Sequence, residues 1–481
     1  MSDLHLTAGV ARIDITPPVG FRMEGAMRRV DPSVGVESPL LATALVLADE
    51  RTKVVVIDCD LIGFDMPLAA EIRTAIADRV GISPGCVALG CTHTHNGPCT
   101  ARRILGGVHH VAGDPAEIRA LDAYVEDLVN RIAGLAVLAD SDRQPARAAA
   151  GSGHAPVAVN REERAPEDGL IVVGRNPDGT TDHSVDVLRV DDLDGNPIAV
   201  VAGYAAHPVV MGFETYLLSQ DFPGVVRRVV EQATGATCLY LTGAAGNQAC
   251  YSFLQSDWGE KERTGGIVGA AALQAFYGIE TRPHEEIRER GLSLSRIALY
   301  HKEFRDGPTH KVLKAASRQV SLPLQPLPSL DQAEAQYAEA AAKVRKLVET
   351  GADSTEVCPA QLVEVWARGV LDKVKAGVRE DSLSFDIVAF RLDDFVLVAQ
   401  PGEPFVEIGL GVKKRSKAKH TMFGGYCNGV LAYMPTAETV AQGGMSVEAA
   451  VRTYDIPAPP VAETMDLLVA EYGELLSEVG F

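Results

Sequence analysis

Two histidines, His93 and His95, lie in the segment Cys91-Thr-His-Thr-His-Asn-Gly-Pro98, directly after the apolar run Val87–Leu89. Residues two apart diverge on a helix but share one side of an extended chain. The spacing therefore favours an extended segment in which one imidazole binds a metal ion and the other serves a substrate. The following Asn-Gly-Pro predicts a sharp turn. In isolation, surface or hydrogen-bonded core histidines explain the pair at least as well.

Two further apolar runs lead into residues of the same chemical kind. Ile198–Ala202 is followed by His207-Pro208, and Phe395–Val398 is followed by Glu403-Pro404. Ligands gather at the carboxyl ends of strands in open α/β sheets, so these side chains form a spatially coherent set. Imidazoles with one carboxylate leave a coordination position open for water. That combination suits catalytic zinc better than a closed structural site.

The elements that must position these residues alternate between strand and helix patterns. Apolar residues recur every third or fourth position in Met66–Val80 and Phe222–Ala233, which predicts helices. Other neighbouring runs are joined by short turns and are expected to pair as antiparallel strands: Val185–Val190 with Ile198–Ala202, and Phe385–Leu392 with Phe395–Val398. The pattern predicts an α/β fold with a mixed sheet.

The texture of the sequence changes between residues 286 and 380, where charged and proline-spaced stretches appear. We expect one catalytic domain over residues 1–481 with a helical insertion at 286–380. Ser329 and Gln332 predict a capping box for a helix over Leu330–Glu349, with Gly351 as its stop. A second helix over Ala360–Lys375 would pair with it as a hairpin, a scaffold or lid without chemistry.

The composition excludes several classes of function. The formal net charge of -19 argues against nucleic-acid or anionic-membrane partners, because both require clustered basic residues. The N-terminus lacks the pattern of a secretion signal, and no apolar run reaches the roughly 18 residues of a membrane span. The eight cysteines form no CxxC pair. We expect a cytoplasmic protein that acts on a small molecule; whether it forms a homo-oligomer stays open.

Motifs spread over nearly the whole chain resemble, in order, those of the neutral/alkaline non-lysosomal ceramidases and their bacterial relatives. The matching segments are Gly9–Pro18, Thr92–Pro98, Val159–Arg161, Ala206–Pro208, Ser219–Asp221, Gly243–Gly246, Pro401–Glu403 and Asn428–Thr436. Only the Thr-His-Thr-His-Asn-Gly-Pro segment is specific by itself, but the ordered set makes chance similarity improbable. The resemblance implies a catalytic domain of neutral ceramidase type.

The resemblance also implies roles for individual residues. It implies a Zn²⁺ ion held by His93, His207, Glu403 and Tyr433. Tyr433 would also take part in catalysis, although a packed aromatic is the alternative for it, since Tyr426 lies close by. His95 is expected beside the scissile group, and Arg161 is expected to orient or polarise the carbonyl. Asp221 is expected either to brace a histidine or to cap the helix that starts at Phe222.

The sequence also departs from the ceramidase pattern. Gly246 stands where ceramidases carry a serine, and the chain leaves no room after Tyr433 for their C-terminal β-sandwich domain. We therefore expect a zinc-dependent amidohydrolase that cleaves an N-acyl bond of a soluble molecule with metal-activated water, rather than an enzyme of membrane ceramide. Ester or lactone hydrolysis, metal-assisted isomerase or lyase chemistry, and a catalytically silent metal-binding scaffold remain as alternatives.

Overall fold

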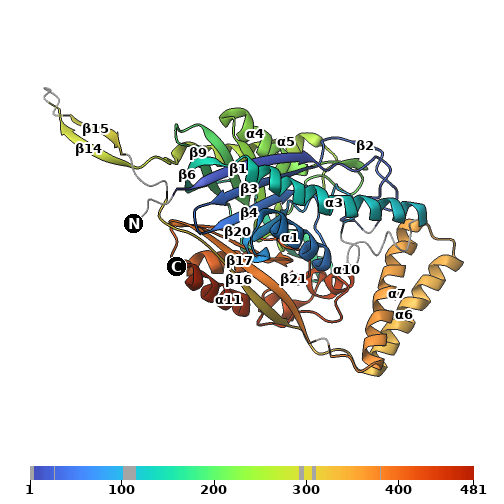
Figure 1. The fold of residues 1–481 in the computed structure, drawn as a ribbon. Helices are drawn as coiled ribbons and strands as arrows, with labels where there is room; N and C mark the ends of the chain where they lie inside the picture. Colours follow the sequence, from blue (N-terminus) through green and yellow to red (C-terminus); the bar gives the residue numbers. More distant parts are fainter. Residues whose placement is uncertain (1–4, 27, 101–114, 292–296, 306–309, 380) are drawn as a thin grey trace.

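Two β-sheets packed face to face form the middle of the molecule, and helices cover the outer face of each (Figure 1). This computed structural model describes residues 5–26, 28–100, 115–291, 297–305, 310–379 and 381–481. Within these residues the larger sheet has eight strands in the order β12-β10-β9-β6-β1-β3-β4-β5, and the second has four in the order β16-β17-β18-β20.

The larger sheet consists of β1 (Thr7–Asp14), β3 (Leu41–Ala48), β4 (Lys53–Cys59), β5 (Val87–Cys91), β6 (Gln144–His154), β9 (Ser184–Asp192), β10 (Pro197–Tyr204) and β12 (Thr237–Thr242). The second consists of β16 (Leu313–Pro323), β17 (Ser382–Leu392), β18 (Phe395–Ala399) and β20 (His420–Gly424). The pairs β4–β5, β10–β12 and β18–β20 are parallel, and their neighbours pair antiparallel. The predicted mixed α/β fold is confirmed, with the antiparallel pairs β9–β10 and β17–β18 where expected.

The core between the sheets arises from the alternation of side chains along each strand. Leu45 on β3 and Val56 on β4 point to the second sheet, where they join a cluster with Phe390 and Leu397. Their neighbours in sequence point to the other side, as Val55 does toward the helices. Both sheets are therefore apolar on both faces, which explains their continuous apolar runs.

Four helices cover the outer face of the larger sheet. They are α1 (Met66–Val80), α3 (Pro115–Ser141), α4 (Asp221–Thr234) and α5 (Trp258–Gly278). The outer face of the second sheet packs against α8 (Val406–Arg415) and α11 (Thr464–Val479). None of the helices in the described part of the chain combines the length and the apolar character that crossing a bilayer requires.

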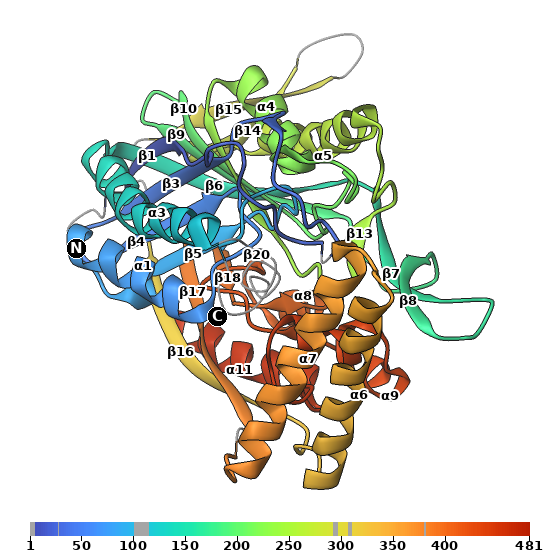
Figure 2. The ribbon, with the colours of Figure 1, turned by 90° about the vertical axis from the view of Figure 1, so that its right-hand side faces the viewer.

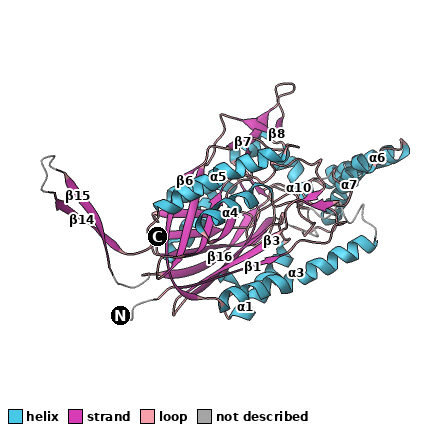
Figure 3. Cartoon of the chain, turned by 90° about the horizontal axis from the view of Figure 1, so that it is seen from above, coloured by secondary structure: helices cyan, strands magenta, loops and turns pink. Residues whose placement is uncertain are grey.

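The sequence had suggested a helical insertion over 286–380, but the interval is not helical throughout. Its first part lies in the hairpin of β14 (His284–Arg290) and β15 (Ala298–Phe304), which projects away from the body (Figures 1 and 3). It also contains β16, a member of the second sheet. Residues 292–296, 306–309 and 380 of the interval lie outside the described residues.

Among the described residues of this interval the helices are α6 (Leu330–Glu349) and α7 (Ser354–Lys375), which lie side by side as a hairpin (Figure 2). The capping box of Ser329 and Gln332 is present as predicted. Gly351 follows α6 in the left-handed conformation, with φ of 69°. The strands of the projecting hairpin escaped the sequence analysis because their residues are exposed on both faces and lack apolar alternation.

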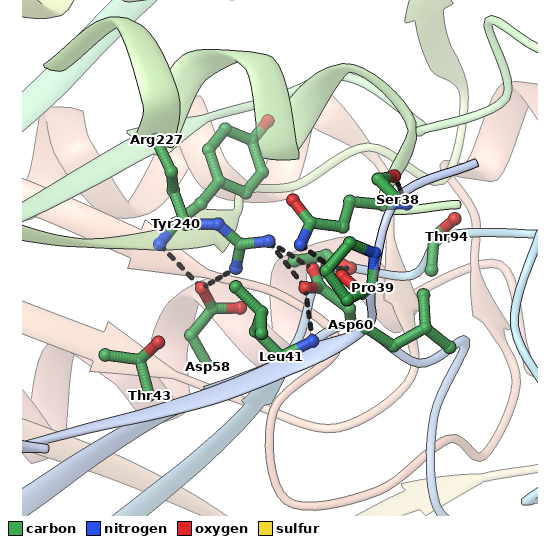
Figure 4. A network of polar contacts seen from close by, with 12 residues as sticks. Ser38, Pro39, Leu41, Thr43, Asp58, Asp60, Thr94, Arg227 and Tyr240 are labelled. Carbon is green, nitrogen blue, oxygen red and sulfur yellow. Dashed lines mark hydrogen bonds and ion pairs between the residues drawn. The ribbon is translucent and has the colours of Figure 1, made fainter. Parts of the chain in front are cut away.

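A buried ion cluster joins α4 to the end of β4 (Figure 4). Arg227 donates to Asp58 Oδ2 and to both carboxylate oxygens of Asp60, each at 2.6 Å. Asp60 also accepts a hydrogen bond from Thr92 Oγ1 at 3.3 Å, and Thr92 is the residue before His93. Burial raises the pKa of Asp58 to about 6, and the positive charge of Arg227 opposes that rise. The cluster therefore holds two carboxylates that would repel each other without the guanidinium.

The first prediction concerns this cluster. Replacing Arg227 by Met leaves two buried acids unpaired and should lower the free energy of unfolding by about 3–5 kcal/mol, measured by chemical denaturation. The matched control is Arg228→Met in the same helix, because Arg228 pairs with Glu262 at the surface; its loss should stay below about 1 kcal/mol. Equal losses in the two variants would contradict the role given to the buried cluster.

Candidate metal centre

Loops at the carboxyl ends of strands from both sheets meet at one place. His93 follows β5, His207 follows β10, and Glu403 lies in β19 (Glu403–Pro404) after β18. Glu403 pairs in register with Tyr433 of β21 (Tyr433–Met434). The segment after β20 joins the sheets here, because Cys427 forms a bridge with Gly90 of β5.

The three histidines of this region are fixed by the same type of contact. Their Nδ1 atoms lie close to backbone carbonyl oxygens: His93 to Ile62 at 2.6 Å, His95 to Gly25 at 3.0 Å, and His207 to Ala245 at 3.2 Å. A carbonyl oxygen only accepts, so each Nδ1 must carry the proton. Each neutral ring then has its lone pair on Nε2, the state in which histidine binds metals.

The Nε2 lone pairs point at one another. The Nε2 atoms of His95 and His207 are 3.2 Å apart, and His93 completes a group whose ligand atoms lie within 4.8 Å of one another. Glu403 Oε2 is 3.8 Å from Nε2 of both His93 and His207. His93 Nε2 is buried and has no hydrogen-bond partner among the described residues. These nitrogen and oxygen atoms fit as ligands of a zinc ion, which binds such atoms at about 2.0–2.2 Å.

Burial sets the protonation of the cluster. It lowers the pKa of His93 to about 3 and the pKa values of His95 and His207 well below the usual range, so all three rings are neutral. Burial raises the pKa of Glu403 to about 7, and the charge of Arg161 opposes that rise. Ionising a carboxyl group in such a site is unfavourable unless a positive charge balances it, and Arg161 at 3.8 Å does so only in part. The cluster therefore favours a bound cation.

Tyrosines surround the carboxylate. The hydroxyl of Tyr426 lies 3.4 Å from Glu403 Oε2 and 3.2 Å from His207 Nδ1, and Tyr454 donates to Glu403 Oε1. Tyr433 accepts from Arg161 Nη2 at 2.9 Å. Burial raises the pKa of all three hydroxyls. The structure places Tyr433 at the centre as expected, but its ligation of a metal stays a prediction. Tyr454 carried no motif that sequence analysis could recognise.

Arg161 lies in β7 (Ala158–Arg164), one strand of a small sheet with β8 (Ile171–Asn176) and β13 (Gln248–Cys250). Its Nε and Nη2 donate to the carbonyl oxygen of Gly246 at 3.0 and 2.7 Å. A Cβ at Gly246 would meet the carbonyl oxygen of Glu403 at 2.5 Å. The position where ceramidases carry a serine therefore has no room for a side chain unless the backbone of Glu403 moves.

Within the described part of the chain no hydrogen bond joins Asp221 to a histidine, so it does not brace one directly. Its carboxylate accepts from the backbone N–H of Met211 at 3.0 Å and of Phe222 at 2.6 Å. It is the first residue of α4 rather than its cap, since Gln220 precedes the helix in that place. Asp221 thus holds the loop that follows His207.

A cavity of about 260 Å³ opens beside the cluster. Its wall includes the four residues His93, His95, His207 and Glu403 together with Arg161 and Tyr433. Most of the remaining wall is apolar: Met23, Ile62, Val173, Val209, Phe213, Phe253, Leu254, Leu362 and Met445. Gly25 lies against His95 so closely that a Cβ there would be 2.4 Å from Nδ1. The six predicted catalytic and metal-binding residues thus border one cavity and Asp221 does not, and their individual roles stay predictions.

The comparisons with known proteins agree with this arrangement. The family described as "Neutral/alkaline non-lysosomal ceramidase, N-terminal" matches residues 6–268. The fold is similar to that of neutral ceramidase from Pseudomonas aeruginosa, with a TM-score of 0.66 over 99% of this chain and 74% of that chain at 18% identity. A ceramidase complexed with C2 gives a TM-score of 0.66 over 98% and 75% of the chains at 16% identity. The resemblance seen in the sequence motifs and the expected fold type are confirmed.

The second prediction concerns metal content. Protein purified without chelator should contain about one zinc ion per chain, and His93→Ala and His207→Ala should each lose most of it, because each removes a buried lone pair. Elemental analysis by mass spectrometry measures the change. His301→Ala, in the exposed hairpin, is the control and should keep its metal. Wild-type metal content in both cluster variants would show that the ion binds elsewhere.

Proposed function

Because the chain belongs to the neutral/alkaline non-lysosomal ceramidase family, we propose that it is a zinc-dependent hydrolase that cleaves the carboxamide bond of a soluble N-acyl compound. One observation carries the proposal: three neutral imidazoles with inward Nε2 atoms lie beside a buried carboxylate in the wall of a cavity. An open site of imidazole and carboxylate ligands is typical of catalytic rather than structural zinc.

We assign the metal to His93, His207 and Glu403, with Tyr433 beside them. When bound, zinc supplies a Lewis acid that polarises a carbonyl oxygen and lowers the pKa of water. Glu403 offsets the charge of the ion, and Tyr454 and Tyr426 hold the carboxylate in place. Because His93 and His207 donate from Nδ1 to buried carbonyls, their rings cannot rotate without losing a hydrogen bond.

His95 is the proton carrier in this proposal. Its ring is partly exposed to the cavity, whereas His93 and His207 are fully buried. Gly25 O fixes its Nδ1 proton, so Nε2 is the atom that accepts a proton from the attacking water and passes it to the leaving amine. The rings of His95 and Phe213 have centroids 6.5 Å apart, so His95 lies next to the apolar wall of the cavity, where we place the substrate.

Arg161 supports the developing negative charge on the substrate oxygen. Arg161 is buried and always charged. Its Nε and Nη2 atoms donate to Gly246 and Tyr433, and Nη1 takes part in neither of these contacts. A donor held this rigidly in a dry site stabilises an oxyanion more strongly than one in water. Tyr433 accepts from Arg161 and is hydrogen-bonded to Glu403, so it links the two groups on this side of the cavity.

A covalent acyl-enzyme finds no support in the cavity wall. Among the described residues that line it, none is serine or cysteine, and Gly246 has no side chain. The one threonine in the wall, Thr453, donates its hydroxyl to the carbonyl oxygen of Ala449 at 3.4 Å, and no histidine or carboxylate is hydrogen-bonded to it among the described residues. Ser252 instead accepts from the exposed side chain of Arg263 in α5. Burial raises the pKa of the Cys91 thiol well above its usual range, so this thiol is a poor nucleophile. We therefore propose that water attacks the carbonyl carbon of the substrate directly.

The soluble nature of the substrate rests on charge and on the size of the cavity. A net charge of -19 disfavours approach to an anionic lipid surface. The cavity of about 260 Å³ is small and mostly apolar, which suits a short acyl amide.

The third prediction tests this chemistry. In single-turnover reactions with short N-acyl amines in heavy-oxygen water, one labelled oxygen should enter the acid product, and intact-protein mass spectrometry should show no acyl adduct. Arg161→Met should lower kcat by about 10²–10³-fold, since it removes one oxyanion donor.

The control is Ser252→Ala, which should hydrolyse the amides at the wild-type rate. An acyl adduct on Ser252, Cys91 or Cys99 would overturn direct attack by water. Absence of turnover across the amide panel, with zinc bound, would overturn the amidase proposal. Micellar long-chain ceramide belongs in the same panel, and its turnover alone would contradict a soluble substrate.

A further inference from the structure

The charged residues in the cavity wall do not balance one another. Among the described residues that line the cavity, two are acids, Glu24 and Glu403, and three are arginines, Arg29, Arg161 and Arg452. Arg161 Nη2 lies 3.8 Å from Glu403 Oε2, and Arg29 attracts the carboxylate of Glu24 and donates to its backbone carbonyl. Arg452 forms no ion pair within the described part of the chain. The wall therefore has an excess of positive charge before any metal binds, in a chain whose net charge is -19.

Arg452 is held at the edge of the cavity by the helical hairpin. Its guanidinium carbon lies over the Trp366 ring, 5.6 Å from the ring centre, a contact that attracts a cation. Trp366 is fixed in turn, because its Nε1 donates to the carbonyl of Ile456 at 2.9 Å. Leu362, one turn earlier on the same face of α7, borders the cavity. Arg452 is exposed, and none of its guanidinium N–H groups donates to another described residue, so these groups can bind a ligand.

The segment that carries Arg452 also reaches the metal centre. Tyr454, two residues later, donates to Glu403 Oε1, and Thr453 between them borders the cavity as well. Because Arg452 and the proposed metal ligands border the same cavity, a substrate that fills it contacts both. Distant surface acids matter less to this substrate than the charge of the wall, since the Debye length is about 8 Å at physiological ionic strength.

We propose that Arg452 binds a carboxylate group of the substrate and so selects anionic N-acyl compounds over neutral ones. A guanidinium matches a carboxylate in shape as well as in charge, since two parallel N–H groups meet two oxygens. A cationic group would face the excess positive charge of the wall, and a bound zinc ion would add to that charge. A neutral group would leave the guanidinium to water and gain nothing from it. The proposal deepens the proposed function, on which it rests, by naming N-acyl compounds with a carboxylate as the substrate class.

The test uses four matched amides and the zinc-loaded full chain. N-hexanoylglycine carries a carboxylate on the amine side, the monoethylamide of adipic acid carries it on the acyl side, N-ethylhexanamide is neutral, and N-hexanoylethylenediamine is cationic. One of the two anionic amides should exceed N-ethylhexanamide in kcat/KM by roughly 5- to 30-fold, more than a fully exposed ion pair gives, because the bound substrate excludes part of the water. Which one does so identifies the side of the substrate that Arg452 contacts. The cationic amide should fall below the neutral one.

Variants assign that preference to Arg452. Arg452→Met should bring the ratio of the anionic to the neutral kcat/KM close to one, and Arg452→Lys should keep part of the preference because the charge remains. Arg368→Met is the matched control, since Arg368 is also exposed and also lies over an aromatic ring, that of Tyr337 at 5.1 Å, but does not border the cavity. Its ratio should equal that of the wild type. Equal kcat/KM for the anionic and neutral amides in the wild type, or a ratio unchanged by Arg452→Met, would overturn the proposal.

Ionic strength gives a readout on the unmodified protein. The preference for the anionic amide should shrink as sodium chloride is raised to about 1 M, where the Debye length is about 3 Å. The kcat/KM of N-ethylhexanamide serves as the reference at each salt concentration. A preference that salt does not weaken would show that a contact other than a charge pair causes it, and would contradict the role given to Arg452.

A binding measurement separates this proposal from the proposed hydrolysis. Ligand-observed NMR on the zinc-loaded chain compares the sulfonamide analogues of the four amides, which have no carbonyl carbon for water to attack. If one anionic analogue binds more tightly than the neutral one and Arg452→Met removes the difference, the carboxylate site stands even when no amide is hydrolysed. If amides are hydrolysed but no difference in binding depends on Arg452, the hydrolase stands and the carboxylate site is wrong.

Discussion

Three backbone carbonyls, two of them in fully buried hydrogen bonds, determine what the rest of the site can do. Each accepts the Nδ1 proton of one histidine, and they come from separate segments: Gly25, Ile62 and Ala245. A buried carbonyl needs a donor, and a buried imidazole is neutral, so both requirements are met by one hydrogen bond. The consequence is that all three Nε2 atoms face inward. A cation bound by His93 and His207 gives a partner to His93 Nε2, which has none among the described residues, and leaves His95 Nε2 for the proton.

One of these carbonyls, that of Ile62, follows a strand end that is fixed by buried charge. Arg227 holds Asp60 at the end of β4, two residues before Ile62, and Asp60 also binds Thr92 beside His93. The segment after β20 completes the arrangement from the second sheet, where Asn428 binds the backbone N–H of Leu89 through Oδ1 at 2.9 Å. Rigidity of this kind is what a preorganised catalytic site requires.

The sequence could identify His93, His207 and Glu403 because each follows an apolar strand, and such strand ends share one edge of a fold. Tyr454 could not be found this way. Its contact with Glu403 reaches across 51 residues, and no local pattern records such pairing. The mixed fold was predictable from apolar runs. The exposed strands within 286–380 were not, because polar residues on both faces leave no periodic signal.

The most direct test of the metal centre is anomalous X-ray diffraction at the zinc absorption edge, on crystals grown without chelator. The account predicts one strong anomalous peak among the side chains of His93, His207 and Glu403, on the cavity side of their Nε2 and Oε2 atoms. A crystal of hydrolytically active protein with no peak at this cluster, or with its only peak elsewhere in the chain, would contradict it.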